Sequence, residues 1–338
     1  MKILITGGAG YIGSTVASAL LDSGHTPILL DSLVTGRPEF TRNRIFYKAD
    51  IANYGALETI FKEHPDIKAC LHCAARIIVP ESVAHPYLYY RENVAKSVEF
   101  FHILHELGCD KVVFSSSASI YDLVPGFMVT EQSPLNPSSP YARTKFMMEM
   151  VLKDFCGAYG MQGIALRYFN PIGADPKMRS GIHVKEPSHI LGKLVDTALG
   201  RIAEFPITGT NYETRDGTGI RDYVHIWDLA RAHVLALTNF KDVFARAGQP
   251  VENYLVINLG TGLGVTVREM VNAFEKVYGQ TINKREMPPR PGDVAGAYAN
   301  ADTALRLLNW KAELPIEDGI RDALKWGELR NQILSWDE

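Results

Sequence analysis

The hydrophobic pattern divides the chain into short apolar runs separated by longer stretches with helical spacing. The apolar runs are Lys2–Thr6, Thr26–Asp31, Ile45–Ala49, Lys68–Ala74, Lys111–Ser115 and Ile164–Tyr168. Each run is apolar almost throughout, which is typical of strands that are covered on both faces. The helical stretches between them include Ile12–Ser23, Pro86–Leu107 and Pro140–Tyr159. This alternation predicts an α/β fold built on a doubly wound parallel sheet.

The alternation ends at about residue 171, where glycine, proline and charged residues become more frequent. We expect a first domain over residues 1–170 and a smaller, mixed α/β second domain over residues 171–338. A helix over Leu229–Leu237 and a buried strand over Tyr254–Asn258 would return the chain to the first sheet. This returning segment, at about 220–260, would interleave the two domains.

The first predicted strand runs into a glycine-rich turn that opens a helix. Gly7, Gly10 and Gly13 permit a tight turn, a close approach of the backbone to a pyrophosphate, and close packing of the helix on the strand. The N–H groups at the start of the helix can then bind the phosphates. Asp31 ends the second predicted strand, where a carboxylate accepts hydrogen bonds from ribose hydroxyls and repels a 2′-phosphate. Arg37 would favour that phosphate but is less well placed, so we predict a Rossmann-like domain that binds NAD.

Asp50 and Ile51 follow the third predicted strand. In a dinucleotide-binding sheet this position can hold the adenine ring. An equally simple interpretation is that Asp50 caps the next helix, because aspartate is a preferred N-cap residue. Both interpretations remain open at this stage.

The segment from Ser138 to Lys145 carries the strongest indication of catalysis. Ser139 can cap a helix, and Pro140 suits the first helical position. Tyr141 and Lys145 then lie four residues apart on one face of that helix. Because a free tyrosine has a pKa near ~10, ionising it at neutral pH costs about 4 kcal/mol. Lys145, the helix N-terminus and a charged nicotinamide would lower that cost, and the phenolate could then act as a general base.

A serine-rich segment follows the fifth predicted strand, at the edge of the sheet where ligands of open α/β sheets bind. Ser117 lies in this segment, and its hydroxyl could bond the same substrate hydroxyl as Tyr141. Serine-rich strand ends are also common in plain turns. Ser117 is therefore a catalytic candidate because of its expected neighbour rather than by itself.

Together, the glycine pattern, Ser117 and the Tyr141–Lys145 pair resemble the extended short-chain dehydrogenase/reductase superfamily. Three further segments narrow the resemblance to the family of UDP-glucose 4-epimerases, along essentially the whole chain. These segments are Tyr168–Ala174, Asp216–His225 and Pro289–Asp293.

The resemblance implies an isomerase in which NAD stays bound and is regenerated in each cycle. Tyr141 would take the proton of the sugar C4 hydroxyl while a hydride leaves C4, and the 4-keto sugar would then turn over and be reduced from its other face. Lys145 and Ser117 would assist. Besides the three glycines, the implied contacts to NAD are Tyr11, Ile12, Asp31, Ser32, Asp50, Ile51, Ala74, Asn93, Tyr141, Lys145 and Phe169. The implied contacts to the UDP-sugar are Ser117, Tyr141, Asn170, His189, Arg221, Arg290, Asp293 and Ala297.

The resemblance also implies a homodimer that buries the helices near 86–107 and 140–159. At three positions the chain departs from the family. Ile77 stands where a lysine reaches NAD, Pro80 replaces a glycine beside the sugar, and Gly192 replaces a proline. Ala297 is small. In the enzymes that the chain resembles, a bulky aromatic residue at this position restricts the pocket to unacetylated sugars. We therefore expect acetylated UDP-hexoses to be converted as well.

Composition and charge limit the other classes of function. The chain has 35 basic and 38 acidic residues, a formal net charge of −3, which provides no broad attraction for nucleic acid or for an anionic membrane. No apolar run approaches the ~18 residues of a membrane span, and we expect no secretory leader. Four cysteines are too few for a disulfide scaffold, so we expect a cytoplasmic protein. Cys70 and Cys73 form no zinc pattern, and we predict no metal site.

Three alternatives to a UDP-hexose 4-epimerase remain. A nucleotide-sugar dehydratase or decarboxylase of this superfamily needs an added acid–base pair just after the serine segment, and here the residues are Ala118 and Ser119. A 4-epimerase acting on UDP-glucuronate or on a dTDP-sugar is also possible. A non-catalytic NAD sensor usually lacks the tyrosine and the lysine, and both are present here.

Overall fold

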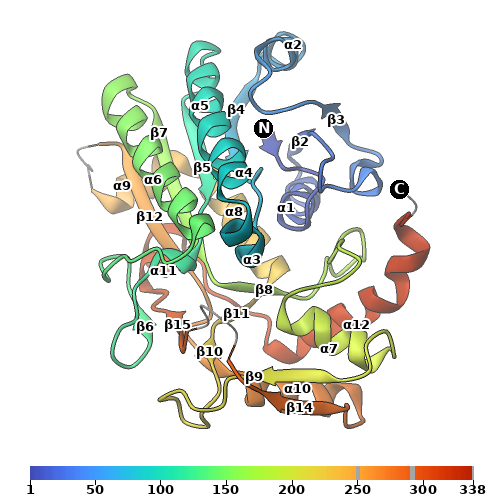
Figure 1. Cartoon of the computed structure of the whole chain (residues 1–338). Helices are drawn as coiled ribbons and strands as arrows, with labels where there is room; N and C mark the ends of the chain where they lie inside the picture. The colour runs from blue at the N-terminus through green and yellow to red at the C-terminus, as the bar shows by residue number, and fades with distance from the viewer. Residues whose placement is uncertain (249–251, 290–293, 337–338) are drawn as a thin grey trace.

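The centre of the molecule is a parallel sheet. In the computed structural model, which describes residues 1–248, 252–289 and 294–336, seven strands form this sheet in the order β12-β7-β5-β4-β1-β2-β3 (Figure 1). All six neighbouring pairs are parallel. The strands are β1 (Lys2–Thr6), β2 (Thr26–Asp31), β3 (Ile45–Lys48), β4 (Ile67–His72), β5 (Lys111–Ser115), β7 (Gln162–Tyr168) and β12 (Tyr254–Leu259). This arrangement confirms the predicted Rossmann-like, doubly wound sheet.

The strand order reverses beside β1. The chain passes from β1 outward to β2 and β3, then returns to β4 on the other side of β1. In open parallel sheets ligands bind at the carboxyl edge near such a reversal. The glycine turn and the ends of β4 and β5 therefore lie where a dinucleotide is expected.

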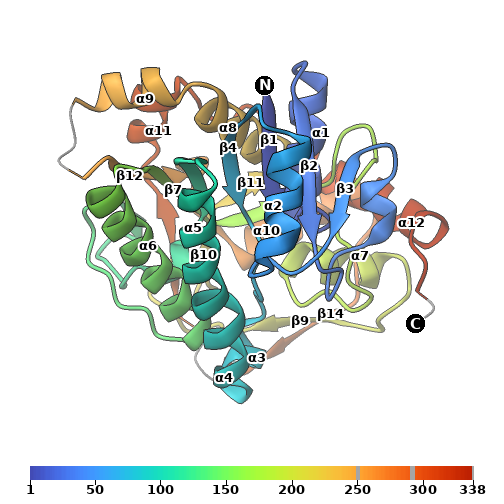
Figure 2. The ribbon, with the colours of Figure 1, turned by 90° about the horizontal axis from the view of Figure 1, so that it is seen from above.

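Helices cover both faces of the sheet, as Figure 2 shows from above. On one face, α1 (Tyr11–Asp22) and α8 (Ile226–Thr238) pack with α9 (Phe240–Ala247) and α11 (Asp302–Leu308) into one apolar core. On the other face, α2 (Tyr54–Glu63), α5 (Lys96–Glu106) and α6 (Pro140–Tyr159) form a second core. The two cores explain why the strands are apolar almost throughout.

The rest of the chain, mainly its second half, builds a smaller, mixed α/β part with its own apolar core. This part lies below the sheet in Figure 1. Its helices are α7 (Ile190–Ala198), α10 (Val267–Tyr278) and α12 (Ile316–Ile333). Its strands are β6 (Met128–Val129), β8 (Asn170–Ile172), β9 (Phe205–Thr208), β10 (Ile220–Arg221), β11 (Tyr223–His225), β13 (Val265–Thr266), β14 (Lys284–Met287) and β15 (Gly296–Ala299).

The chain returns to the first sheet as the sequence predicts. The helix expected over Leu229–Leu237 is part of α8, which His225 caps by accepting a hydrogen bond from the backbone N–H of Trp227. The strand expected over Tyr254–Asn258 is β12, which pairs with β7 at the edge of the sheet. Segments far apart in the sequence therefore share one sheet.

The stretch Pro86–Leu107 is not the single α-helix that we expected. It divides into α4 (Pro86–Tyr89), a π-helical turn over Tyr90–Ala95, and α5. Within the π-helical turn, Asn93 binds the backbone of Arg76 through both ends of its amide. Because a π-helical turn is wider than an α-helical one, Asn93 can reach the loop that contains Arg76. Such turns are frequent at functional sites.

The end of β4 is also earlier than expected. The strand stops at His72, because the next residues turn towards β1. The N–H of Cys73 donates to the carbonyl of Thr6 at 3.1 Å, and the N–H of Ala74 donates to the Thr6 hydroxyl at 3.3 Å. Two 3₁₀ turns, Pro38–Thr41 and Ala118–Ile120, and the short helix α3 (Val79–Ala84) complete the connections.

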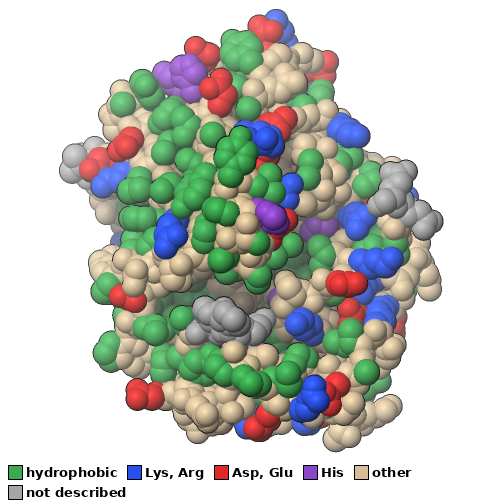
Figure 3. Space-filling view, viewed as in Figure 1, with side chains coloured by type: hydrophobic (Ala, Val, Ile, Leu, Met, Phe, Trp, Pro, Cys, Tyr) green, Lys and Arg blue, Asp and Glu red, His purple; other side chains and the backbone are tan. Residues whose placement is uncertain are grey.

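A hollow separates the sheet-bearing part from the smaller part in the space-filling view of Figure 3. Apolar side chains surround it on that face. In the described ranges no helix is long and apolar enough to cross a membrane.

Candidate active site

The glycine turn brings α1 into direct contact with the end of β1. Gly7 has a φ of +67°, and a Cβ added there would lie 2.7 Å from the backbone nitrogen of Ala74. A Cβ on Gly13 would lie 2.3 Å from the carbonyl oxygen of Gly7. No side chain caps α1 at Gly10, so the first N–H groups of the helix are available to a phosphate. These contacts fit a bound pyrophosphate.

Asp31 lies at the end of β2 with its carboxylate already oriented. Its two oxygens accept hydrogen bonds from the N–H groups of Ala9 at 3.0 Å and Leu33 at 2.8 Å. Burial raises the pKa of Asp31, while these two bonds act in the opposite direction. The carboxylate is 8% exposed beside the glycine turn, which fits the ribose of a dinucleotide. Ser32, the next residue, is exposed.

Arg37 is held away from this carboxylate. Its guanidinium donates to the carbonyl oxygens of His183 at 3.0 Å and Ser335 at 3.3 Å, and it lies 4.9 Å from the ring centre of Trp336. The structure therefore ties Arg37 to the C-terminal segment. The side chain after β2 that faces the turn is Asp31.

The interpretation of Asp50 as a helix cap is wrong, because Asn53 caps α2. Asp50 accepts a hydrogen bond from the N–H of Ala52 at 3.0 Å and pairs with Lys96 at 2.5 Å. Its neighbour Ile51 is 7% exposed. The contact of these residues with adenine stays a prediction.

The other residues expected near NAD lie around the same edge. The hydroxyl of Tyr11 donates to the carbonyl oxygen of Gly173 at 2.7 Å, which ties α1 to the second half of the chain. Ile12 packs against the core of the sheet. Asn93 also donates to the hydroxyl of Thr144, in the first turns of α6, at 3.1 Å. Phe169 is partly buried just after β7.

Tyr141 and Lys145 lie in the first turns of α6, as their spacing predicts. Ser139 caps the helix, and Pro140 starts it. Tyr141 is 9% exposed, and its phenol lies near the hydroxyl of Ser117, which follows β5 and bonds Ser119 at 2.9 Å. Lys145 is 3% exposed, donates to the carbonyl oxygen of Ser115 at 2.8 Å, and lies 6.0 Å from the ring centre of Tyr141. The three catalytic candidates therefore meet at the carboxyl edge of the sheet.

The electrostatics differ from the expectation at one point. Burial raises the pKa of Tyr141, and the nearby hydroxyl of Ser117 only partly opposes this. Burial also lowers the pKa of Lys145 to about 8, although Cys73 and Glu149 act in the opposite direction. The desolvation of both groups exceeds the mutual stabilisation that we expected from the sequence. Burial thus favours the uncharged phenol at this position.

The loop after β4, in which Ile77 and Pro80 depart from the family, lies next to this site. Ile77 is 63% exposed, and Pro80 lies in the first turn of α3, where proline fits. Arg76 pairs with Glu81 at 3.5 Å. The loop is thus held by Asn93 and by this ion pair. Ile77 cannot supply the positive charge of the lysine that the family has at its position.

Cys70 and Cys73 are free thiols in the structure. Cys70 is fully buried, and Cys73 lies 3.0 Å from the hydroxyl of Ser115. Burial raises the pKa of Cys73 to about 11. Among the described residues no three metal-ligating side chains form a cluster. Cys70 packs in one core of the sheet, and Cys73 packs against the other.

Arg221 and Ala297 face each other across the pair β10–β15. The guanidinium of Arg221 donates to the carbonyl oxygens of Ala295 at 2.8 Å and Val294 at 3.1 Å. This arrangement requires Gly296, whose φ is +115°, because a Cβ there would lie 2.0 Å from the guanidinium. Asn170 is the first residue of β8, and it pairs with Tyr223, the first residue of β11. Tyr223 follows Arg221 by two residues in the chain.

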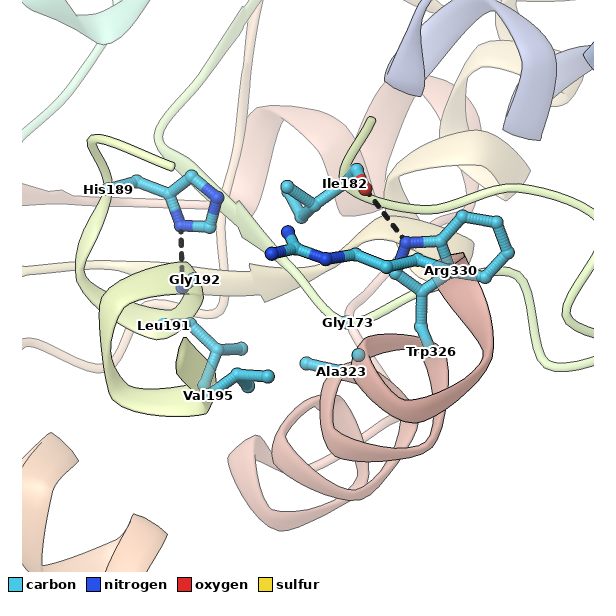
Figure 4. Close-up of a pocket in the computed structure, with 10 residues that line it drawn as sticks. Gly173, Ile182, His189, Leu191, Gly192, Val195, Ala323, Trp326 and Arg330 are labelled. Atoms are coloured by element: carbon cyan, nitrogen blue, oxygen red, sulfur yellow. Dashed lines mark hydrogen bonds between the residues drawn. The ribbon is translucent and has the colours of Figure 1, made fainter. Parts of the chain in front are cut away.

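His189 lies in a small cavity between α7, α12 and the loop before α7 (Figure 4). Its Nδ1 accepts a hydrogen bond from the N–H of Gly192 at 3.1 Å and so caps α7. Burial lowers the pKa of His189 to about 4, which keeps the ring neutral. A Cβ at residue 192 would lie 2.9 Å from the ring, so the glycine makes room for it.

The cavity itself is too small for a nucleotide. Its volume is about 10 Å³ for a water-sized sphere, close to what one water molecule needs. Trp326, Ala323 and Arg330 from α12 form its wall (Figure 4). The structure therefore shows His189 as a helix cap, and its contact with a sugar nucleotide stays a prediction.

Arg290 and Asp293 lie outside the described residues, so their predicted contacts to substrate stay predictions. One functional candidate was not identified from the sequence. Glu149 is 4% exposed and lies four residues after Lys145 on the same face of α6. This spacing is the signal in the chain that could have identified it.

The glycine turn, the oriented Asp31 and the Tyr141–Lys145 pair together define a dinucleotide-dependent α/β enzyme. Comparison with known families specifies it further. The model of the NAD dependent epimerase/dehydratase family matches residues 3–249, and the chain belongs to this family.

Individual relatives agree with this assignment. The chain is 39% identical over 337 residues to the UDP-glucose 4-epimerase of Bacillus subtilis (strain 168), covering 96% of both chains. The crystal structure of a UDP-glucose-4-epimerase from Stenotrophomonas maltophila, with bound NAD and formylated UDP-arabinopyranose, superposes with a TM-score of 0.91. It is 36% identical and covers 98% of this chain and 99% of its own. The UDP-Glc/GlcNAc 4-epimerase from Campylobacter jejuni has a TM-score of 0.80 at 31% identity, covering 97% of this chain and 99% of its own. The resemblance seen in the sequence is confirmed.

The clamp around Arg221 generates a testable prediction. Gly296→Ala places a Cβ 1.9 Å from the carbonyl oxygen of Ile220 and expels the guanidinium. We expect a loss of at least about 2 kcal/mol in the free energy of unfolding, measured by chemical denaturation. Gly157→Ala in α6 is the control, since its Cβ meets no atom within 4 Å. It should gain about 0.5–1 kcal/mol. Equal stability of the two variants would contradict the clamp.

Proposed function

We propose that the chain is a NAD-dependent 4-epimerase of UDP-hexoses that interconverts UDP-glucose and UDP-galactose. The observation that carries this proposal is the buried Tyr141, which lies near the Ser117 hydroxyl and has Lys145 beside it on α6. The three side chains lie at the sheet edge that the glycine turn and Asp31 prepare for a dinucleotide. Solved relatives that contain NAD and UDP support the same ligands.

The geometry supports a simple division of labour. When bound, NAD supplies the acceptor and then the donor of the hydride. Ser117 hydrogen-bonds the C4 hydroxyl, and Tyr141 takes its proton. Lys145 stabilises the phenolate by its charge and holds the turn after β5 through Ser115. After the sugar has turned over, so that the other face of C4 would receive the hydride, Tyr141 would return the proton to the C4 oxygen.

The remaining predicted contacts belong to the same proposal. Arg221, Arg290 and Asp293 would bind the UDP part with Asn170 and His189, since guanidinium groups suit a diphosphate. Residues 1–170 with the returning segment 220–260 would carry NAD, and residues 171–338 the sugar nucleotide. We also propose a cytoplasmic homodimer through the helices near 86–107 and 140–159.

The dehydratase alternative has less support. Ala118 and Ser119 form the short 3₁₀ turn after Ser117, and neither can serve as the acid or base for elimination of water. Incubation with a panel of UDP- and dTDP-sugars, including UDP-glucuronate, followed by separation of the products, tests the reaction class and the substrate together. Formation of the C4 epimer of a UDP-hexose supports the proposal, whereas loss of water or of carbon dioxide contradicts it.

The role of Tyr141 can be tested by removing its hydroxyl. Tyr141→Phe should slow turnover by roughly 10²–10⁴-fold, the usual contribution of a general base. Binding of NAD and of substrate should stay nearly unchanged, because the ring still fills the same space. Steady-state kinetics and ligand titration measure both quantities. A variant with more than a tenth of wild-type activity would show that another group is the base.

A closed reaction cycle requires that the cofactor stays bound. The purified protein should therefore carry NAD or NADH, which denaturation releases for quantification. Adding a UDP-hexose should produce the absorbance or fluorescence of bound NADH without net NADH in solution. Weak, rapidly reversible NAD binding would contradict the cycle, and so would NADH formed in proportion to product.

The small Ala297 predicts a wider range of substrates. It lies beside Gly296 and opposite Arg221, so it leaves room near the sugar for a 2-acetamido group. We expect interconversion of UDP-N-acetylglucosamine and UDP-N-acetylgalactosamine as well as of the hexose pair.

Ala297→Tyr should abolish activity on the acetylated pair by steric exclusion and spare the hexose pair. Ala297→Ser, a small replacement, is the matched control and should keep both activities. Equal loss on both pairs with Ala297→Tyr, or an acetylated activity missing from the wild type, would show that another residue limits the pocket.

A further inference from the structure

Successive serines at the end of β5 contact one face of α6 at three points. Each contact involves a residue one helical turn after the previous one, since 141, 145 and 149 are spaced by four. The contacts are Ser117 with Tyr141, the carbonyl oxygen of Ser115 with Lys145 at 2.8 Å, and the hydroxyl of Ser116 with Glu149. The first two involve catalytic candidates. Glu149 occupies the third position of the same row.

Glu149 is held there by an ion pair inside the molecule. Arg167, on β7, binds both carboxylate oxygens, at 2.9 and 2.6 Å. Both side chains are only 4% exposed. The guanidinium also donates to the hydroxyl of Tyr121 at 2.9 Å, which in turn donates to Asn258 on β12 at 2.7 Å. The position of the carboxylate is therefore fixed by three parallel strands.

Stability alone is a poor reason for this pair. Removing two charges from water costs several kcal/mol for each ion, and well-packed apolar residues of similar volume are often equally stable. A buried ion pair therefore raises the question of which neighbouring group it acts on. Here the neighbour is Lys145, whose pKa is lowered by burial and raised by Cys73, just after β4, and by Glu149 on its own helix. The pair is neutral as a whole, but its negative end is the one carried on α6, one turn behind Lys145.

We propose that Glu149, anchored by Arg167, is a positioning residue for the reaction. It keeps Lys145 charged while the site is dry, and its bond from Ser116 holds the turn that presents Ser117 to Tyr141. Glu149 does not touch substrate in this role. The proposal rests on the proposed function, because it assigns Lys145 the task of stabilising the Tyr141 phenolate.

Glu149→Gln tests the charge while keeping an acceptor for Ser116. Without the negative charge both Lys145 and Tyr141 lose protons more easily, so both limbs of the pH profile of kcat should move to lower pH. We expect a shift of about one pH unit, the lower end of the effect of a nearby opposite charge. On the alkaline side of the profile, above the pKa of Lys145, kcat should fall roughly tenfold, since one pKa unit changes the protonated population tenfold there. KM and the bound NAD should stay unchanged.

Glu149→Asp keeps the charge and should restore most of the wild-type profile. Because Glu149→Gln leaves Arg167 unpaired, the double variant Glu149→Gln/Arg167→Met removes the pair as a unit and preserves folding. It should still show the lower kcat and the shift of both limbs in the same direction. Asp228→Asn is the control, since Asp228 is a fully buried carboxylate paired with Arg231 at 3.1 Å in α8, on the opposite face of the sheet. It should lose stability without moving the profile.

A folded double variant with the wild-type profile and a kcat within twofold would overturn the proposal and leave a purely structural role. So would a Glu149→Asp variant with the same shift as Glu149→Gln. Spectroscopic titration of the phenolate, taken as the difference between each protein and its Tyr141→Phe counterpart, does not depend on turnover. If no UDP-hexose is epimerised but this titration moves to lower pH in Glu149→Gln, the proposed function fails and the electrostatic coupling stands.

Discussion

The close approach of α1 to β1 is the constraint on which the rest of the site depends. A Cβ on Gly13 would overlap the carbonyl oxygen of Gly7, so helix and strand meet at a distance that only glycine allows. The same turn brings Ala74, two residues after the end of β4, against Gly7. The start of α1, Asp31 and the end of β4 therefore surround one point of the sheet edge. The end of β5 and the first turns of α6 complete the ring around it, which places Tyr141 at the same edge of the sheet as the glycine turn.

The local pattern of apolar and polar residues was sufficient to predict much of this architecture. Continuous apolar runs identify β1, β2 and β5 with their observed bounds, because strands buried on both faces have no polar positions to obscure them. The spacing of Tyr141 and Lys145, with a serine cap and a proline before them, places both on one face of α6. These features follow from the residues themselves and their nearest neighbours in the chain.

Other features depend on contacts that no local pattern contains. The bond from Tyr11 to Gly173 spans 162 positions in the sequence, and the π-helical turn at Asn93 reflects its hold on Arg76 across a loop. The pKa of Tyr141 required its depth of burial, which the helical spacing alone does not give. Glu149 was missed because its partner Arg167 comes from a strand, and only the folded sheet brings that strand alongside α6.

The attachment of Arg37 to the C-terminal segment has a consequence for cofactor engineering. A redesign towards NADP would replace Asp31 and recruit a guanidinium to the 2′-phosphate, and Arg37 is the basic residue that follows β2. Its donors already serve the carbonyl oxygens of His183 and Ser335, and its face lies against Trp336. A change of nucleotide preference would thus require the tail of the protein to be detached as well as the carboxylate replaced. Contacts with the C-terminal segment thus keep Arg37 from reaching a nucleotide bound beside Asp31.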